Sequence, residues 1–427
     1  MTTSTSSCRS GRPPDPAALP SGRDRGPESD RGGVLLTDLR ITDLRSYASL
    51  DVTFPLGPIL VFGPNASGKT SLLEAIVLAA RGRSARAATD SDLVRIGADM
   101  LRVEARIGPS GEDDASAVVE LAIVRPGTVA AGQGSRKRLR VNGVARRVGA
   151  LGAWLRVVLF APEDMLLVAG APGLRRAMID ELASLLSPAY AADLASYGRA
   201  LAQRNSLLRA IREDEAARAD LRMWDTPLVD AGAMIVEKRL GLLDAVAIPL
   251  ADAHAEIAPD EALGASLGLR YETNAPPGPS ESVRDALERR LAETADKEIW
   301  NGATLIGPHR DDIVFTLGDR DLASYGSRGQ QRTAILALKL AEIDLLTARD
   351  GRPPLLLLDD VFSELDVERR SHLVRRLTSL PQAFVTTTTP SDLDPRLVAR
   401  ATTYEVVPGA EGAGAGLRGP GVRVAGR

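Results

Sequence analysis

A complete phosphate-binding motif of the form Gly-x-x-x-x-Gly-Lys-Thr spans residues 63–70. Its members are Gly63, Pro64, Asn65, Ala66, Ser67, Gly68, Lys69 and Thr70. An apolar run, Ile59-Leu60-Val61-Phe62, precedes the motif and an apolar-periodic stretch follows it, so the required strand, loop and helix are all expected. Backbone N–H groups in such a loop surround phosphate at a helix N-terminus, where the helix dipole favours an anion. The sequence therefore predicts a site for a nucleoside triphosphate.

Two side chains of this motif have separate chemical roles. Lys69 places a compact positive charge on the β- and γ-phosphates, which makes it a predicted catalytic residue as well as a binding residue. The Thr70 hydroxyl supplies one ligand to Mg²⁺. A glycine-rich loop that matches by chance is the alternative, and the correct flanking elements argue against it.

Two carboxylates follow a second apolar run later in the chain. Leu355-Leu356-Leu357-Leu358 leads directly into Asp359 and Asp360, the pattern of a buried strand with an acidic end. An acid in this place can reach Mg²⁺, so Asp359 is the predicted metal ligand beside Thr70. Asp360 is the predicted base that polarises the attacking water. A buried strand with a merely solvated acidic end is the alternative, which the phosphate-binding loop in the same chain disfavours.

A third candidate segment precedes an apolar-periodic helix and reads Ser327-Arg328-Gly329-Gln330-Gln331-Arg332. Ser327 offers a hydroxyl, Gly329 a close backbone N–H, and the two arginines positive charge for a phosphate. A simple loop with a helix N-cap gives the same pattern. The spacing alone does not separate these two readings.

The elements that position these residues can be predicted coarsely. Alternating apolar residues favour strands from Leu36 onwards, with a hairpin turn at Asn142-Gly143, until about Pro162. Residues 172–297 are mostly helical by period, apart from a short strand pattern at residues 267–272. After Gly302 the pattern returns to mixed helix and strand.

Composition limits the class of protein. The chain has 427 residues, 44% of them hydrophobic, and 53 Lys and Arg against 56 Asp and Glu. A net charge of −3 gives no global basic field, so any nucleic-acid contact must come from local patches. Cys8 is the only cysteine, which excludes a disulfide framework and fits the cytoplasm. No apolar run is long enough to cross a bilayer, and no membrane association is expected.

The three motifs, in this order, resemble an ABC-type ATPase head. More narrowly, the chain resembles the RecF family of bacterial recombination mediators, whose heads are related to those of SMC and Rad50-like ATPases. Asp359 and Asp360 followed by Val361-Phe362-Ser363-Glu364-Leu365-Asp366 fit this family. Further agreement comes from Leu44-Arg45-Ser46-Tyr47, Phe160-Ala161-Pro162-Glu163-Asp164, Gly170-Ala171-Pro172-Gly173-Leu174-Arg175-Arg176 and Gly307-Pro308-His309-Arg310-Asp311-Asp312.

The resemblance implies an α/β fold, an ABC-type P-loop ATPase head with a mixed sheet and helices, plus an inserted helical lobe and disordered tails. The expected segments are a disordered tail at 1–33, ATPase lobe I with the P-loop at 34–165, a mainly helical lobe II at 166–300, the C-terminal part of the ATPase with the Ser327 segment and the two acids at 301–408, and a second disordered tail at 409–427.

The resemblance also implies that the nucleotide is ATP and that the site is shared by two copies of the chain. In ABC-type heads the serine segment of one subunit closes on the nucleotide of the other. Ser327, Gly329 and Gln330 would therefore bind ATP in trans, with Ser327 acting catalytically and Asp366 near the same junction. ATP would drive homodimerisation, and slow, DNA-stimulated hydrolysis would release the dimer.

The partners that the resemblance implies are duplex or gapped DNA with single-strand junctions, together with RecR and RecO. The expected function is DNA replication and recombinational repair, in which the protein supports recombinase loading at gaps and induction of the SOS response. Positive charge for phosphate contacts gathers on the predicted hairpin, at Arg136, Lys137, Arg138, Arg140, Arg146 and Arg147. A solvated hairpin edge is an equally good reading of these residues.

Two departures from the ABC pattern bear on the alternatives. Asp360 stands where many ABC ATPases have Glu, and its shorter arm puts the reach to water in question. The glutamine loop and switch histidine of transport ATPases are also missing, which weakens a transport-type ATPase without DNA binding as an alternative. A nucleotide-gated scaffold without hydrolysis is the other alternative. His309 and Arg45 could each have a structural role or act in the ATP site, and the sequence does not decide between these roles.

Overall fold

The strand that leads into the phosphate-binding motif, β3 (Gly57–Phe62), lies inside a six-stranded sheet. The computed structural model describes residues 34–84, 86–109, 117–128, 136–362, 365–409 and 414–423. Strands β14, β3, β13, β12 and β8 are parallel and β15 is an antiparallel edge strand. Their bounds are Val157–Phe160 for β8, Leu355–Asp359 for β12, Gln382–Thr387 for β13, Thr402–Val407 for β14 and Gly416–Arg418 for β15. Every residue of β12 and β13 is buried, as expected where both faces of a parallel sheet are covered.

A second sheet has seven strands, all antiparallel, in the order β16-β2-β1-β4-β5-β6-β7. In β5, buried residues alternate with partly exposed ones, because one face of this sheet covers a core and the other faces solvent. The bounds are Val34–Leu44 for β1, Tyr47–Thr53 for β2, Met100–Pro109 for β4, Ala117–Val124 for β5, Arg136–Val141 for β6, Val144–Ala145 for β7 and Val422–Arg423 for β16.

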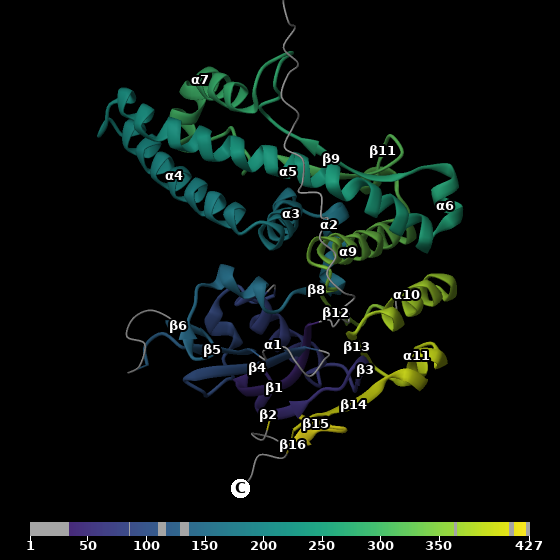
Figure 1. Ribbon diagram of the computed structural model, residues 1–427. Helices are drawn as coiled ribbons and strands as arrows, with labels where there is room; N and C mark the ends of the chain where they lie inside the picture. Colours follow the sequence, from purple (N-terminus) through teal and green to yellow (C-terminus); the bar gives the residue numbers. More distant parts are fainter. Residues whose placement is uncertain are drawn as a thin grey trace, which may run out of the picture. The chain divides into compact units, whose positions relative to one another are not determined.

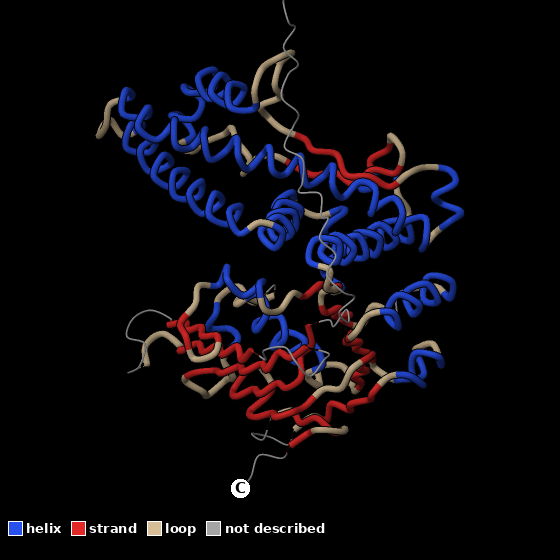
Figure 2. The backbone as a smooth tube through the Cα atoms, in the orientation of Figure 1, coloured by secondary structure: helices blue, strands red, loops and turns tan. Residues whose placement is uncertain are grey.

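Helix α1 (Lys69–Arg81) packs against both sheets. Ten of its 13 residues are buried, which is the pattern of a helix covered on nearly all sides. Its apolar side chains share one core with Leu39 and Val103 of the antiparallel sheet and with Ile59 and Leu357 of the parallel sheet. Gln382 adds a polar link, because its side-chain amide accepts from Leu36 N–H and donates to Leu36 O, each at 3.0 Å. In Figure 2 the strands of both sheets lie in the lower half of the view.

The predicted hairpin at Asn142-Gly143 is confirmed. Strands β6 and β7 pair antiparallel across this turn. Asn142 and Gly143 have φ values of 51° and 76°, the positive values that a two-residue hairpin turn needs. The Asn142 side chain accepts a hydrogen bond from Val118 N–H at 2.7 Å, which ties the turn to β5.

The predicted helical lobe is also present (Figure 1). It contains α2 (Leu166–Ala169), α3 (Pro172–Leu186), α4 (Pro188–Arg212), α5 (Arg222–Ile257), α6 (Pro259–Gly264) and α7 (Val283–Asn301). The predicted strand at residues 267–272 is β9 (Leu267–Glu272), which pairs with β10 (Asp312–Leu317); β11 (Arg320–Asp321) completes this three-stranded sheet. The sheet therefore crosses the lobe boundary expected at residue 300. No helix in the described part of the chain is long and apolar enough to cross a membrane.

Helix α9 (Arg328–Asp350) joins the helical lobe to the parallel sheet. Ile335 and Leu338 of α9 belong to the same continuous core as Leu243 of α5 and Leu60 of β3. The helical lobe thus shares its core with the sheet. The other helices among the described residues are α8 (Leu322–Tyr325), α10 (Val367–Ser379) and α11 (Pro395–Arg400). Short 3-10 helices lie at Asp90–Leu93, Val148–Ala153, Pro162–Met165, Arg218–Leu221 and Pro390–Asp392.

The C-terminal segment differs from the expected disordered tail. Within residues 414–423, β15 pairs with β14 and β16 pairs with β2. The prediction was wrong for these strands because a Gly- and Ala-rich composition hides the few apolar residues, while two sheet edges supply hydrogen-bond partners. The expected N-terminal tail, 1–33, lies outside the described residues, as do 410–413, 424–427 and the motif residues 363 and 364.

Candidate nucleotide-binding site

The phosphate-binding loop runs from the end of β3 to Gly68, the residue before α1. Gly63 and Gly68 have φ values of 155° and 118°, which L side chains rarely adopt. A Cβ at Gly63 would also lie 2.6 Å from the carbonyl oxygen of Val406, so the backbone of β14 approaches too closely for a side chain. The strand, loop and helix expected from the sequence are therefore all present.

Lys69 is folded over its own loop. Its Nζ donates to the carbonyl oxygens of Gly63 at 2.7 Å and of Pro64 at 2.9 Å, and the residue is only 8% exposed. Burial lowers the pKa of this ammonium, while the carboxylates of Asp360 and Asp359 oppose the shift. A bound phosphate can replace the neutral carbonyl partners with a stronger, charge-assisted hydrogen bond.

The structure brings Thr70 and Asp359 together. Thr70 Oγ1 donates to Asp359 Oδ2 at 2.9 Å and lies 3.1 Å from Oδ1, and Asp359 is buried at the end of β12. Two adjacent oxygen ligands suit Mg²⁺, which prefers oxygen and keeps several ligands from water or substrate. In the residues that the structure describes, no group of three His, Cys, Asp or Glu side chains could hold a metal. The pair is therefore compatible with the Mg²⁺ site predicted from the sequence, for which these two side chains would supply oxygen ligands.

Thr386, at the end of β13, is a site residue that the sequence analysis missed. Its Oγ1 donates to Asp359 Oδ1 at 2.7 Å and accepts from Asp360 N–H at 3.0 Å. One residue beyond this strand, Thr388 Oγ1 lies 3.4 Å from Asn65 Oδ1 of the phosphate-binding loop. Because β13 lies between β3 and β12, its carboxyl end supplies hydroxyls between the loop and the acids.

Asp360 follows β12 with a φ of 53°, a strained value for a residue with a side chain. Burial raises the pKa of its carboxyl, Asp359 adds to that shift, and Lys69 opposes it. A raised pKa brings a carboxylate closer to the range in which it can accept a proton during catalysis. The position is compatible with the predicted role as base.

A cavity of about 290 Å³ lies over the loop. Residues 65–70 line it together with Asp359 and Asp360, whereas Gly63 and Pro64 belong to the loop without lining the cavity. Four lining residues were not predicted for this site: Ser46, Ser71, Arg86 and Pro162. Arg86 lies 3.3 Å from Asp359 Oδ2 and also pairs with Glu163, which follows β8. The long sequence separation of these partners explains why motif reasoning did not find Arg86.

Ser327 is the N-cap of α9. Its Oγ accepts from Gln330 N–H at 3.2 Å, and the Gln330 side chain accepts from Ser327 N–H at 2.9 Å, which completes a capping box. Ser327 is exposed, and neither it nor Gly329 nor Gln330 is among the described residues that line the cavity. Within one chain, Ser327, Gly329 and Gln330 therefore do not contribute to the cavity over the phosphate-binding loop. Arg332, one turn further on, lines a smaller cavity of about 90 Å³ with Asp359 and Asp360.

Exposed apolar side chains flank the segments that the resemblance places at a dimer junction. Tyr325, just before Ser327, is 76% exposed, and Val367 is 83% exposed. Between β12 and α10, Asp366 is the N-cap of α10, where its side chain accepts from Arg369 N–H at 2.9 Å. The two candidate junction segments thus present exposed surface.

His309 and Arg45, which the sequence left open, have structural partners. His309 Nδ1 lies 2.6 Å from Tyr197 OH and Nε2 lies 3.1 Å from Thr304 O, while burial lowers the histidine pKa to about 4. Arg45 pairs with Glu74 of α1 at 2.8 Å and donates to Asp92 O. Both residues are therefore assigned hydrogen-bonding roles in the fold.

The predicted DNA contacts lie on β6 and after the hairpin turn. Lys137 pairs with Asp90 at 3.0 Å. The side chains exposed to solvent are those of Arg136, Arg138, Arg140, Arg146 and Arg147. The strand register places Arg140 opposite Glu120, and Glu104 between Glu120 and Arg40.

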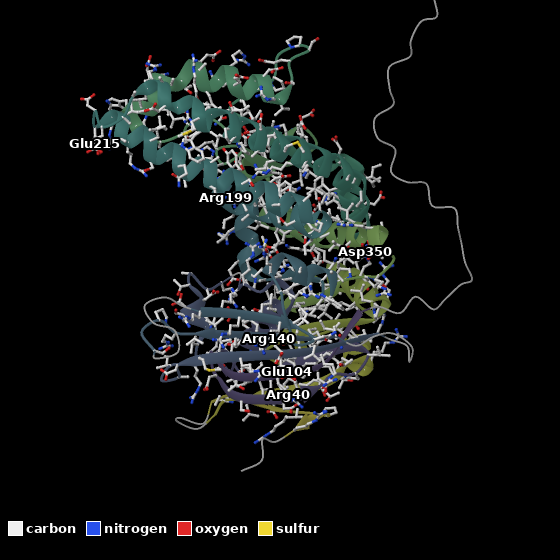
Figure 3. All side chains as sticks on the ribbon, turned by 60° about the vertical axis from the view of Figure 1, so that its left-hand side comes forward. Arg40, Glu104, Arg140, Arg199, Glu215 and Asp350 are labelled. Carbon is white, nitrogen blue, oxygen red and sulfur yellow. The ribbon has the colours of Figure 1, made fainter. Side chains whose placement is uncertain are left out.

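The rest of this sheet face is nearly neutral. Arg40 pairs with Asp51 at 2.9 Å and with Glu104 at 3.3 Å. Figure 3 labels Arg40 and Glu104, which lie on the neighbouring strands β1 and β4, and Arg140, which lies on β6 beyond β5. Arg106 lies 3.7 Å from Asp38. Positive charge is therefore concentrated at β6 instead of being spread over the sheet.

The parallel sheet, the phosphate-binding loop after β3 and the two carboxylates at the end of β12 define a P-loop nucleotide-binding head. The family profile described as "RecF/RecN/SMC N terminal domain" matches residues 35–400. A relative from Frankia alni, "DNA replication and repair protein RecF", is 40% identical over 88% of this chain and 98% of its own length. The Bacillus subtilis protein of the same name is 35% identical over 88% and 99% of the two chains. This protein belongs to the RecF family of DNA replication and repair proteins.

Solved structures agree with this assignment. The recombination mediator protein RecF-ATPrS in the RecFOR pathway is 30% identical, covers 88% of this chain and 97% of its own, and superposes with a TM-score of 0.78. The corresponding RecF-ATP structure is 29% identical, covers 90% and 98% of the two chains, and has the same TM-score of 0.78. An Smc head domain from Pyrococcus yayanosii, 14% identical with a TM-score of 0.51, shares the fold.

Proposed function

We propose that this protein is a Mg²⁺-dependent ATPase. The contact of 2.9 Å between Thr70 and Asp359 carries the proposal, because it places two Mg²⁺-compatible oxygens beside a phosphate-binding loop. Residues 63–70 would hold the phosphates, with Lys69 on the β- and γ-phosphates. The metal ion, when bound, supplies positive charge to the phosphate oxygens. The related RecF-ATP and RecF-ATPrS structures support ATP as the nucleotide.

Asp360 would accept a proton from the attacking water. Burial already raises the pKa of this carboxyl, and Thr386 holds the backbone of Asp360 by a hydrogen bond of 3.0 Å. The Asp360 side chain is shorter than the Glu that many ABC ATPases have at this position, so it reaches less far towards the attacking water. We therefore expect slow ATP turnover from this site, and we expect DNA to stimulate it.

ATP binding would join two copies of the chain. Ser327, Gly329 and Gln330 of one copy would complete the site of the other, with Ser327 acting in trans. The exposed position of Ser327, outside the cavity of its own chain, and the exposed Tyr325 and Val367 nearby support this arrangement. The dimer would then be a two-state switch, because ATP favours the closed state and hydrolysis removes the group that both copies bind.

The dimer would bind duplex or gapped DNA with single-strand junctions. The exposed arginines of β6 and the hairpin support phosphate contacts, which need positive charge more than base recognition. Within the cytoplasm, the protein would work with RecR and RecO in recombinational repair, support recombinase loading at gaps and promote SOS induction. The RecFOR pathway to which the related structures belong supports these partners.

Mg·ATP binding and phosphate release by the wild type and Lys69→Ala test the proposed activity. We expect Lys69→Ala to abolish binding because it removes the phosphate-facing charge. Lys238→Ala is the matched control, since this lysine of α5 pairs with Asp193 at 2.5 Å. A protein that binds ATP without releasing phosphate would instead be a nucleotide-gated scaffold. ATP hydrolysis without any DNA binding at low salt would indicate a transport-type ATPase.

A further inference from the structure

Residues 414–423, here named the C-terminal clasp, contact both sheets of the nucleotide-binding head. Through β15 the clasp adds the last strand to the parallel sheet, and through β16 it adds the last strand to the antiparallel sheet. Thr53 N–H donates to Gly421 O at 3.0 Å. Leu417 is only 7% exposed and belongs to the core around α1. The first part of the clasp, residues 414–417, is therefore packed against the head, whereas residues 418–421 are exposed.

At its start, the clasp lies against the turn that joins β1 to β2. Ala415 N–H donates to the carbonyl oxygen of Ser46 at 2.6 Å. Gly414 has a φ of 74° and lies so close to this turn that a Cβ there would be 2.7 Å from Ala48 N and 2.9 Å from Ser46 O. The backbone of the clasp and the backbone of the turn are thus in direct contact.

The same turn contacts Gly68 of the phosphate-binding loop. Tyr47 OH donates to Gly68 O at 3.2 Å. A Cβ at Gly68 would lie 2.7 Å from Ser46 Oγ and 3.3 Å from Ala415 Cβ, so both the turn and the clasp adjoin this glycine. Gly68 directly precedes Lys69 and Thr70. A shift of the turn would therefore move the start of the helix that carries both phosphate-site side chains.

We propose that the clasp is a positioning element of the nucleotide site: it holds the Ser46 turn against Gly68 and thereby sets the affinity for ATP. This inference rests on the proposed function as an ATPase. Ser46 lines the cavity, whereas Ala415 and Gly414 are not among the described lining residues, so the clasp acts through the turn. Sites that bind phosphate by backbone N–H groups depend on such support, because small misplacements of the loop weaken several hydrogen bonds together.

A purely protective role for the clasp is the competing explanation. Both β2 and β14 would be edge strands without it, and covered edges resist unwanted strand pairing. In that case, loosening the clasp would lower thermal stability or solubility without changing how the folded protein binds ATP. Nucleotide affinity of folded protein therefore separates the two roles.

The experiment compares two glycine substitutions in the full-length chain. Gly414→Ala puts a methyl group against the Ser46 turn, and the matched control Gly416→Ala puts one where the nearest atom, Val407 O, is 4.0 Å away. Mg·ATP binding would be measured by calorimetry well below the melting temperature of each apo protein. We expect Gly414→Ala to weaken binding by roughly tenfold, in the range known for small misplacements of positioning groups, and Gly416→Ala to leave it unchanged.

A pair of shortened chains provides the second comparison. One ends at Gly409 and lacks the clasp, and its control ends at Arg423 and keeps it. The chain without the clasp should bind Mg·ATP more weakly than Gly414→Ala; if it does not fold, the two glycine variants still decide. Wild-type affinity in Gly414→Ala, with or without a lower melting temperature, would overturn the positioning role. If wild type bound ATP no better than Lys69→Ala, the proposed function itself would fail, and the inference with it.

Discussion

Thr70 Oγ1 lies 2.9 Å from Asp359 Oδ2, although 289 positions separate the two residues along the chain. The strand order β3-β13-β12 explains this contact, because the carboxyl ends of parallel strands meet at one edge of the sheet. The same edge carries the phosphate-binding loop and Thr386. A triphosphate held by the loop would therefore lie beside the oxygen ligands for its metal ion.

Replacing the metal ligand should separate binding from chemistry. We expect Asp359→Asn to lower Mg²⁺-dependent phosphate release by at least about a hundredfold, because the amide loses the charge that attracts the ion. Removing Mg²⁺ with a chelator should stop hydrolysis by the wild type. A Mg²⁺ titration of phosphate release checks both expectations. Normal rates and metal dependence in Asp359→Asn would exclude this residue as the ligand.

The neighbouring acid has a different expected phenotype. Asp360→Asn should keep ATP binding, reduce hydrolysis by about a hundredfold or more, and accumulate ATP-bound dimers, because only the proton acceptor is removed. Phosphate release and light scattering on the same sample measure the two effects. Normal hydrolysis in Asp360→Asn would show that another group is the base.

Thr386 offers a test of a contact that motif reasoning did not reveal. Thr386→Val removes the hydroxyl that donates to Asp359 at 2.7 Å and accepts from Asp360 N–H at 3.0 Å, while keeping the side-chain volume. We expect kcat to fall by roughly tenfold, since one net hydrogen bond contributes about 1 kcal/mol and the strained Asp360 backbone loses its partner. The control is Thr387→Val, because the Thr387 hydroxyl donates instead to Thr389 O. Equal effects of the two substitutions would argue against a specific role.

Ser327 has a structural role as well as its proposed role in trans, and a matched variant separates them. Ser327→Ala and Ser282→Ala each remove an N-cap hydroxyl, from α9 and α7 respectively, and each should cost about 1 kcal/mol of stability. Only Ser327→Ala should lose ATP-dependent dimerisation while a monomer still binds ATP. If Ser327→Ala formed dimers at the same ATP concentrations as the wild-type protein, the composite site would be contradicted.

Buried His309 predicts a pH dependence of stability. Burial lowers its pKa from 6.5 to about 4, so the unfolded chain takes up a proton at higher pH than the folded protein does. The stability associated with neutral His309 is fully present above pH 6.5 and decreases as the pH falls towards 4, by up to about 1.4 kcal/mol per pH unit.

Denaturant unfolding at pH 7 and pH 5 measures this dependence. His309→Gln should reduce the difference in unfolding free energy between the two pH values. An unchanged difference in His309→Gln would contradict the assigned environment of His309.

The local structure around the candidate site could be predicted from the sequence: a strand, loop and helix around Gly63 to Thr70 and a buried strand before Asp359. Gly63 to Thr70 and the acids after Leu358 are continuous motifs, and a glycine, lysine or carboxylate at such spacing has few other uses. Asn142-Gly143 also predicted its turn, because both residues tolerate positive φ. These features depend on residues that are adjacent in the sequence, so they can be predicted without knowledge of the tertiary structure.

The missed features depend on tertiary structure. Thr386 becomes a site residue only because β13 lies between β3 and β12, and Arg86 only because its loop reaches Asp359. The clasp was expected to be disordered because Gly and Ala give little apolar periodicity. Its strands form where the edges of β2 and β14 offer hydrogen-bond partners, and no local pattern encodes those edges.

Sedimentation velocity with a short DNA duplex, with and without Mg·ATP, tests the central claim most directly. The composite-site account predicts monomers without nucleotide, and dimers that co-sediment with DNA when Mg·ATP is present. Raising the salt concentration should release the DNA, because phosphate contacts are screened. The account would be contradicted by a protein that stays monomeric with saturating Mg·ATP and that does not bind the duplex at low salt, either with or without Mg·ATP.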